Sequence, residues 1–230
     1  MCGRYNEHVA KMAGWSQALQ DWPSHALSYN RAPTTQVAAF RDTTGELMRW
    51  GMVAPWSKEF GGKFSTFNAR IETVADKPTF HNAWKKKQRC LVPMAGYYEW
   101  IGSKGNKQAM YITDRDTGGL VTAGLYESWG DDGLLSCTIL TAPANDELFH
   151  IHPRMPIMLT PESAQLWLNG SGLNGSGLSG SGLNNTELNA PADILQLERP
   201  NVVYHPVSKA VGNVRNDGAE LIEPIDINSV

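Results

Sequence analysis

The stretch RCLVPMAGYYEWIGSKGNKQAMYITDRDTGGLVTAGLYESWGDDGLLSCTILT, residues 89–141, decides the fold class. Short runs of β-branched, aromatic and other apolar residues alternate in it with turn sequences rich in Gly, Asp, Asn and Ser, which is typical of consecutive strands. We expect strands at residues 89–94, 96–101, 109–113, 120–127 and 134–141. No helical period separates these runs, so the pattern favours antiparallel pairing over a doubly wound sheet.

Further elements are predicted on both sides of this stretch. Residues 36–41 and 46–52 flank the turn sequence Asp42-Thr43-Thr44-Gly45 and predict a hairpin, and residues 201–205 predict one more strand. Helices are expected at residues 77–87 and 161–168, the second after Thr160-Pro161-Glu162, an N-cap followed by proline and an acidic first turn. Another amphipathic helix is predicted after Asn6 because apolar residues recur at helical spacing before Pro23: Val9, Met12, Ala13, Leu19 and Trp22.

Strands outnumber helices and rarely alternate with them. This predicts an α+β fold, a single domain with a curved, largely antiparallel sheet or partial barrel flanked by a few helices. The chain has 230 residues, of which 41% are hydrophobic, enough for one compact core. We expect the domain at residues 1–224 and a tail at 225–230. A Leu, Asn or Ser, Gly, Ser, Gly repeat predicts a flexible surface insertion at 168–185, because such a composition cannot offset backbone entropy.

Composition and charge exclude several classes of protein. Lys and Arg total 20 against 23 Asp and Glu, a net charge of -3, which excludes a globally basic nucleic-acid coat but allows a local basic cleft. The sequence has no apolar run of about 18 residues and no signal-peptide pattern, so we expect a cytoplasmic monomer that does not bind membranes. The three cysteines have neither disulfide-framework nor zinc-site spacing, so neither a metal nor another cofactor is expected.

Cys2 differs from the other two cysteines. Cys90 and Cys137 lie in strand-like runs, where cysteine acts as a small buried hydrophobe. Initiator methionine is ordinarily trimmed before a small residue, which would leave Cys2 as the mature N-terminus. Its α-amine, with a reference pKa of about 7.7 to 8.0, and its thiol, with one of about 8.5, are then both partly nucleophilic at neutral pH. Such a residue can act in acyl transfer, or condense with an aldehyde to an imine and then to a thiazolidine ring.

A set of short motifs in a fixed order resembles the SOS-response-associated peptidase (SRAP) family from Met1 to about Pro224. The motifs are Met1-Cys2-Gly3-Arg4, Tyr29-Asn30-Arg31-Ala32-Pro33, Trp50-Gly51-Met52-Val53-Ala54-Pro55-Trp56, Asn68-Ala69-Arg70-Ile71-Glu72-Thr73, Gly96-Tyr97-Tyr98-Glu99-Trp100, His152-Pro153-Arg154-Met155-Pro156 and His205-Pro206-Val207-Ser208-Lys209-Ala210-Val211-Gly212-Asn213. Members of this family bind single-stranded DNA and form a protective covalent crosslink with abasic sites through the terminal cysteine. The resemblance also implies removal of Met1 by the protein itself and a weak lyase activity.

The resemblance implies that Cys2 is the crosslinking residue and that Asn68, Glu99 and His152 are the active-site asparagine, glutamate and histidine. Opening of the abasic sugar and loss of water from the carbinolamine both need proton transfer. Glu99, if desolvated between two aromatic neighbours, would have a raised pKa and act as acid and base; strand alternation alone predicts an outward, solvated carboxylate. His152 titrates in the right range to protonate the ring oxygen, and Asn68 can orient the sugar or the amine.

DNA contacts are expected from residues close to this set. Arg4, Arg70 and Arg154 follow Cys2, Asn68 and His152 by two residues each, so convergence of the active residues would bring three guanidinium groups together. We assign base stacking to Trp56, with Trp50 as a second candidate. Asn30 and Thr141 complete the expected DNA contacts. The run Lys85-Lys86-Lys87 is interpreted as a solvated helix face.

Two other functions stay open at this level. An N-terminal-nucleophile cysteine amidohydrolase is the first, because glutamine amidotransferases also begin Met-Cys-Gly and use the freed amine as a base. The second is a noncovalent single-stranded DNA-binding module in which the cysteine is incidental. A protease acting on other proteins fits least well. Release of ammonia from glutamine would identify the amidohydrolase, and DNA binding that never becomes covalent would identify the module.

Overall fold

The computed structural model describes residues 2–8, 12, 15–16, 18–61, 65–103, 105–169 and 188–226. Its strands are β1 (Tyr5–Asn6), β2 (Gln36–Phe40), β3 (Gly45–Trp50), β4 (Asn68–Arg70), β5 (Arg89–Met94), β6 (Gly96–Ile101), β7 (Gln108–Asp114), β8 (Leu120–Trp129), β9 (Leu134–Pro143), β10 (Arg154–Pro156), β11 (Met158–Leu159) and β12 (Val202–Val207). The α-helices of the described residues are α1 (Pro78–Lys85), α2 (Asp146–Phe149) and α3 (Pro161–Asn169). Single 3-10 turns lie at Ile71–Thr73, Asp193–Gln196, Lys209–Gly212 and Ala219–Ile222.

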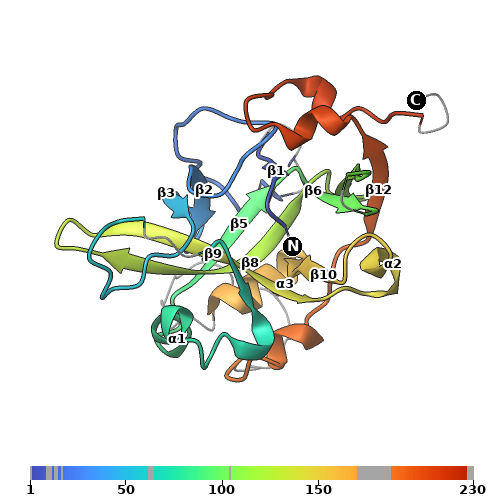
Figure 1. Ribbon diagram of the computed structural model, residues 1–230. Helices are drawn as coiled ribbons and strands as arrows, with labels where there is room; N and C mark the ends of the chain where they lie inside the picture. Colours follow the sequence, from blue (N-terminus) through green and yellow to red (C-terminus); the bar gives the residue numbers. More distant parts are fainter. Residues whose placement is uncertain are drawn as a thin grey trace.

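The larger of two sheets closes into a barrel. Its strand order is β10-β9-β3-β2-β5-β8-β11, and β8 also pairs with β9, so β9, β3, β2, β5 and β8 form a closed ring. Most pairs are antiparallel, while β3 and β4 run parallel to β9. Helices α1 and α3 pack against β8 and β5 on the outside (Figure 1). The predicted α+β fold with a curved, largely antiparallel sheet is confirmed, and the partial barrel is closed.

The second sheet, of order β1-β6-β7-β12, holds the start of the chain. Its β1 pairs antiparallel with β6, with Tyr5 opposite Tyr97 and Asn6 opposite Gly96. Any Cβ at Gly96 would lie 2.4 Å from the Tyr111 ring, so only glycine leaves room for that ring. The Tyr111 hydroxyl in turn accepts a hydrogen bond of 3.1 Å from Asn6 Nδ2. Because Gly96 has no side chain, the Tyr111 ring of β7 packs over β6 at this point and binds Asn6 of β1.

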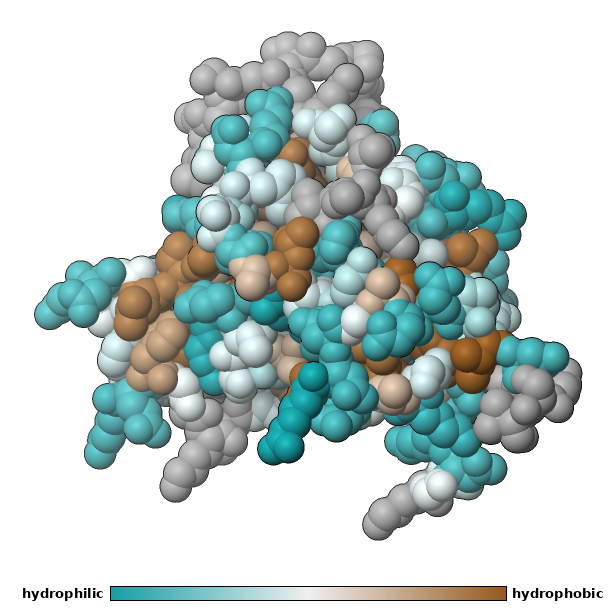
Figure 2. Space-filling view, turned by 90° about the horizontal axis from the view of Figure 1, so that it is seen from above, coloured by the Kyte–Doolittle hydropathy of each residue, from teal (hydrophilic) through white to brown (hydrophobic). Residues whose placement is uncertain are grey.

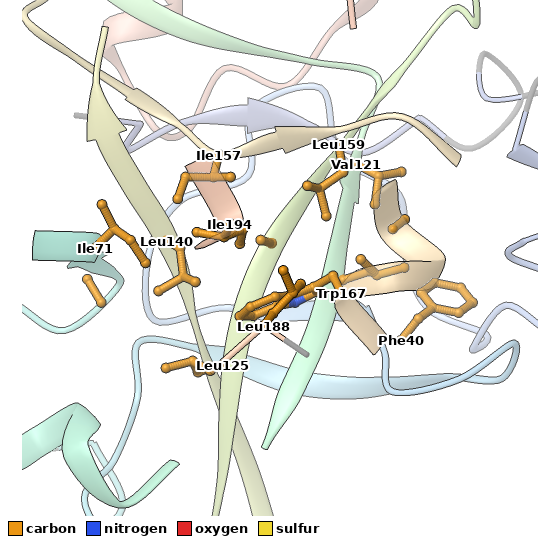
Figure 3. Close-up of a cluster of buried hydrophobic side chains, with 14 of the residues drawn as sticks. Phe40, Ile71, Val121, Leu125, Leu140, Ile157, Leu159, Trp167, Leu188 and Ile194 are labelled. Atoms are coloured by element: carbon orange, nitrogen blue, oxygen red, sulfur yellow. The ribbon is translucent and has the colours of Figure 1, made fainter. Parts of the chain in front are cut away.

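One core cluster joins the barrel to the helices that cover it. Figure 3 shows Leu140 and Leu125 of the barrel strands near Ile71, Ile194 and Trp167. Trp167 of α3 is fully buried, and its indole N–H donates to the Cys90 carbonyl oxygen over 3.1 Å. The Arg89 guanidinium lies over the same indole, 4.4 Å from the ring centroid. These contacts fix α3 on β5 through both apolar burial and a polar link.

Most predicted elements are confirmed, but the described residues of the segment after Asn6 do not form the predicted helix. Asn6 belongs to β1, Trp15 begins a short turn closed by a hydrogen bond from Leu19 N–H to the Trp15 carbonyl, and Asp21 forms a bridge with Thr44. Val9 and Ala13 lie outside the described residues. Of the apolar residues that suggested a helix, Met12 and Leu19 are buried in the core cluster and Trp22 packs against it, so burial against the barrel accounts for their apolar character without a helix. Strands β4, β10 and β11 were missed because two or three residues carry no readable period.

The predicted insertion at 168–185 falls mostly outside the described residues, as do residues 227–230 of the predicted tail. Its first two residues, Leu168 and Asn169, belong to α3. In the tail, Ile225 N–H donates to the Pro206 carbonyl over 3.0 Å, so the tail begins in contact with β12. The domain boundaries stay a prediction.

The face seen in Figure 2 is mainly polar, with apolar side chains in separate groups. Within the described part of the chain, no helix is long and apolar enough to cross a membrane.

Burial along β9 generates a prediction about stability. Leu140 is fully buried in the core, whereas Leu134 on the same strand is 42% exposed. Leu140→Ala should lower the free energy of unfolding by about 2 to 5 kcal/mol, because it removes packed atoms and leaves a cavity. Leu134→Ala is the matched control and should change it by about 0.5 kcal/mol or less. Urea denaturation of both variants measures the difference, and equal losses would contradict this packing.

Candidate functional site

Cys2 is held inside the protein by its backbone. Its side chain is fully buried, and Asn68 Nδ2 donates to its carbonyl oxygen over 2.6 Å. Two residues further on, the Arg4 carbonyl accepts a hydrogen bond of 3.0 Å from Tyr98 N–H. The first residues therefore lie between β6 of one sheet and β4 of the other. Cys2 and Asn68, 66 residues apart in the sequence, are brought together as predicted.

Glu99 lies beside Cys2 in the same buried region. Continuing the β1–β6 register by two residues puts Gly3 opposite Glu99. Burial raises the pKa of the Cys2 thiol well above its ordinary value, and the nearby Glu99 carboxyl raises it further. The thiol therefore keeps its proton at neutral pH. Glu99 is only 5% exposed, so the outward, solvated orientation that alternation suggested is wrong: β6 is covered on both faces over most of its length.

Asn68 presents one engaged group and one open group. Its Nδ2 is committed to the Cys2 carbonyl, while its buried Oδ1 has no hydrogen-bond partner among the described residues. A buried amide oxygen without a partner is costly to the folded protein, of the order of 1 to 3 kcal/mol. The arrangement suits a ligand that brings an N–H or O–H donor to this oxygen next to Cys2.

His152 occupies the turn between α2 and β10. Asn145 caps α2 by accepting from Leu148 N–H over 3.1 Å, and His152 N–H donates to the Leu148 carbonyl, also over 3.1 Å. The imidazole Nδ1 lies 3.0 Å from Arg154 N and 2.9 Å from the Arg154 carbonyl oxygen, so it accepts from the first in one tautomer and donates to the second in the other. In either tautomer the backbone of Arg154 engages Nδ1 and orients the ring.

Arg70 and Arg154 meet on either side of one residue of β9. Thr141 is the register partner of Arg70 in β4, and its carbonyl and hydroxyl oxygens accept from Arg154 Nη2 over 2.8 and 3.1 Å. Arg154 also makes a two-pronged ion pair with Glu72, at 2.6 and 3.0 Å. Arg70 is exposed and forms no ion pair with any described residue. Arg70 thus offers an exposed positive charge that is not held in a close ion pair among the described residues, although it lies near enough to Glu72 to help lower the pKa of that carboxyl.

Arg4 has a different set of partners. Its Nη1 donates to Asn30 Oδ1 and to the Val211 carbonyl, each over 3.0 Å. Asn30 is buried, and its Nδ2 points at carbonyl oxygens of residues 211, 213 and 216 at 2.9 to 3.2 Å. These two side chains fasten the C-terminal segment to the start of the chain. The Arg4 guanidinium therefore contacts residues 30 and 211–212, whereas that of Arg154 contacts Thr141 and Glu72.

The two candidate stacking tryptophans differ in exposure. Trp56 is 60% exposed in the loop after β3. Trp50 is fully buried, its indole N–H donates to the Phe67 carbonyl over 2.9 Å, and its ring packs edge-on against Tyr5 at 5.0 Å. The assignment of Trp50 to base stacking is therefore wrong, because its aromatic faces are already covered. Trp56 keeps a face open.

Two carboxylates of this region were missed in the sequence. Glu72 pairs with Arg154, and its place in the Asn68–Thr73 motif was the available signal. Glu7 is 1% exposed; its Oε2 accepts from Arg31 Nε over 2.8 Å and its Oε1 from Ala38 N–H over 2.9 Å. Glu7 thereby ties the N-terminal segment to β2. No sequence pattern around Glu7 indicates this, because both partners are distant in sequence. The described residues hold no group of three or more His, Cys, Asp or Glu arranged for a metal ion.

Solved structures support the fold. A crystal structure of a protein from Bordetella bronchiseptica matches with a TM-score of 0.71 at 24% identity, covering 90% of this chain and 100% of the other. One from Bacteroides thetaiotaomicron matches with a TM-score of 0.73 at 21% identity, covering 96% of this chain and 99% of the other. At these identities the likeness shows the architecture.

Sequence comparisons show the family. The family model described as SOS response associated peptidase (SRAP) matches residues 1–214. Abasic site processing protein YoqW of Bacillus subtilis is 32% identical over 97% of this chain and 99% of its own length. Abasic site processing protein HMCES of Gallus gallus is 30% identical over 78% of this chain and 57% of its own length. The match spans Cys2, Asn68, Glu99 and His152 and nearly the whole fold, and the chain therefore belongs to the SRAP family.

Proposed function

We propose that this chain binds single-stranded DNA and processes abasic sites, forming a thiazolidine crosslink between Cys2 and the sugar aldehyde after Met1 is removed. The names of the relatives support abasic-site processing. The observation that carries the proposal is the burial of Cys2 beside the Glu99 carboxyl, with Asn68 bound to the Cys2 carbonyl. A buried thiol, a carboxyl and an open amide oxygen suit a condensation that moves protons.

The crosslink needs no cofactor for its chemical balance. The Cys2 amine adds to the aldehyde carbon, and the carbinolamine loses one water to become an imine. The Cys2 sulfur then adds to the imine carbon, while the thiol proton passes to the imine nitrogen and closes the five-membered ring. Ring closure removes the imine that would otherwise permit β-elimination and strand cleavage, so protection and lyase activity compete from one intermediate.

Glu99 and His152 fit the proton transfers. Burial and Glu99 raise the pKa of the Cys2 thiol, so the sulfur is protonated before it reacts. It must therefore lose its proton to a base as it adds to the imine carbon. Glu99 is placed to give a proton to the departing hydroxyl as the carbinolamine loses water, and then, as a carboxylate, to take the thiol proton when the sulfur adds and pass it to the imine nitrogen. We assign His152 to protonate the sugar ring oxygen as the hemiacetal opens, with its ring oriented by the contacts of Nδ1 with the Arg154 backbone. Asn68 Oδ1 accepts from the amine or a sugar hydroxyl.

We assign DNA binding to residues on an exposed face, and these residues contribute unequally. Arg70 contributes a phosphate contact, and Arg154 contributes one weakened by Glu72. Asn30 and Thr141 are buried, so we assign them a share in DNA binding through the arginines that they hold, Arg4 and Arg154. Trp56 stacks on an unpaired base, which favours single-stranded DNA. We further propose a monomer acting in the cytoplasm, a compartment that keeps the three free cysteines reduced.

Cys2 should be indispensable for the crosslink. Protein mixed with single-stranded DNA carrying one abasic site should give a species that survives a denaturing gel, and Cys2→Ala should abolish it because the thiazolidine needs the sulfur. Cys137→Ala is the matched control, a buried cysteine inside the barrel, and should still crosslink. Intact mass should show that the crosslinking form lacks Met1. A normal yield of crosslinked DNA with Cys2→Ala would contradict the mechanism. Release of ammonia from glutamine would favour an amidohydrolase instead.

Glu99→Gln should slow crosslinking by about 10²-fold or more, the usual size of general acid-base catalysis. Single-turnover rates with saturating abasic DNA measure the effect on the chemical steps. The exposed Glu223→Gln provides a control at a surface position and should react at the normal rate. If Glu99→Gln also kept the normal rate, Glu99 would have a structural role only.

Arg70→Ala should weaken binding of single-stranded DNA and reduce the salt dependence of the binding constant. Loss of one phosphate contact lowers the slope of log K against log salt by about 0.7 on a single strand. Fluorescence anisotropy at several salt concentrations gives the slope, with the exposed Lys107→Ala in the β6–β7 loop as a charge-matched control. An unchanged slope for Arg70→Ala would exclude this phosphate contact.

A further inference from the structure

A hollow outside the Cys2 region lies between α1, the loop after β3 and the end of β8. Its volume is about 850 Å³, and residues lining it include Trp56, Asn82, Lys86, Gln88 and Glu127. Helix α1 and the end of β8 lie on the same side of the barrel in Figure 1. The volume is within the usual range of small-molecule sites, about 300 to 1,000 Å³, and is ample for one nucleobase.

The floor of this hollow presents hydrogen-bond acceptors. Glu127 is 3% exposed; its Oε2 accepts from Asn82 Nδ2 over 2.6 Å and its Oε1 from Ser128 N–H over 3.3 Å. An ionised carboxylate has about four acceptor positions, so these two contacts leave room for two more. No Lys, Arg or His of the described residues forms an ion pair with Glu127. The buried Gln88 Oε1 also has no hydrogen-bond partner among the described residues.

The aromatic side chain of Trp56 lines the same hollow as these acceptors. Trp56 is 60% exposed, yet its loop is pinned to the barrel because Trp129 Nε1 donates to the Ser57 carbonyl over 2.9 Å. The Phe60 and Trp129 rings add a contact at 5.7 Å. A fixed, open indole next to buried acceptors suits a planar group that carries N–H donors on its edge. The exposed Lys86 at the rim attracts a phosphate and repels a cationic side chain, which favours a nucleotide over an arginine of a partner protein.

We propose that this hollow is a subsite for one guanine of the bound DNA strand. Guanine alone places two donors, N1–H and the 2-amino group, side by side on its Watson–Crick edge, where they match the two free positions of the Glu127 carboxylate. Adenine, cytosine and thymine each have only one donor group on that edge, with an acceptor next to it, so none offers two adjacent donors. The proposal rests on the proposed function, because the strand that reaches the hollow is the one held near Cys2. It adds a base preference at a fixed distance from the abasic site.

The test measures equilibrium binding of 15-nucleotide oligo(dT) strands without an abasic site, each carrying one dG, dI or dA at a scanned position. We expect one register at which dG binds about tenfold more tightly than dA or dT, the size of one good base contact. Inosine lacks the 2-amino group and should lose most of this gain. Equal affinity for all bases at every register would overturn the proposal, as would tight binding of free dGMP without any preference within a strand.

Variants connect the preference to the hollow. Glu127→Gln should abolish the dG preference, because an amide presents its own donors to the guanine edge, whereas the exposed Glu223→Gln should retain it. Since Glu127 is buried, thermal melting checks its fold, and Trp56→Ala at an exposed position supplies a second variant that should also lose the preference. A dG preference retained in folded Glu127→Gln would refute the subsite. Crosslinking of abasic DNA by the unmodified protein is measured separately: normal crosslinking without a base preference refutes the subsite alone, and a dG preference without crosslinking refutes the proposed function alone.

Discussion

The pairing of β1 with β6 is the constraint on which the candidate site depends. It aligns Tyr5 with Tyr97 and brings the start of the chain alongside Glu99. A two-residue strand is too short to hold itself, so its position comes from contacts at both ends. Asn68 binds the Cys2 carbonyl on one side, and Glu7 is bound to Arg31 and to the backbone of β2 on the other. Cys2 is thereby fixed by the two sheets together.

Charge in this protein is arranged locally, against a net charge of -3. Arg154 is paired with the Glu72 carboxylate, whereas Arg4 keeps its charge but uses its donors on Asn30 and on backbone carbonyls. Arg70 keeps its charge exposed. The Cys2 thiol, in contrast, is buried. Burial raises its pKa and so favours a neutral sulfur beside the Glu99 carboxyl. The groups proposed for phosphate binding and for proton transfer therefore lie in different surroundings, one exposed and one buried.

The strands of the central stretch could be predicted because each is long enough to show apolar runs between turn residues. The hairpin and helices α1 and α3 followed from equally local signals, a turn sequence and an N-cap. The helix after Asn6 and the outward orientation of Glu99 were wrong for a common reason. In both cases contacts with a distant part of the chain decide burial, and local periodicity carries no information about them.

Residue chemistry and motif order by themselves determined the fold class, the family resemblance and the candidates Cys2, Asn68, Glu99 and His152. Only the tertiary structure decided that Trp50 is a core residue while Trp56 is exposed, and that Arg4 and Arg154 have different partners. It also revealed Glu7, Glu72 and the hollow at Glu127. The physical reason is that side-chain type is written in the sequence, whereas burial and hydrogen-bond partners are set by residues that meet only after the barrel closes.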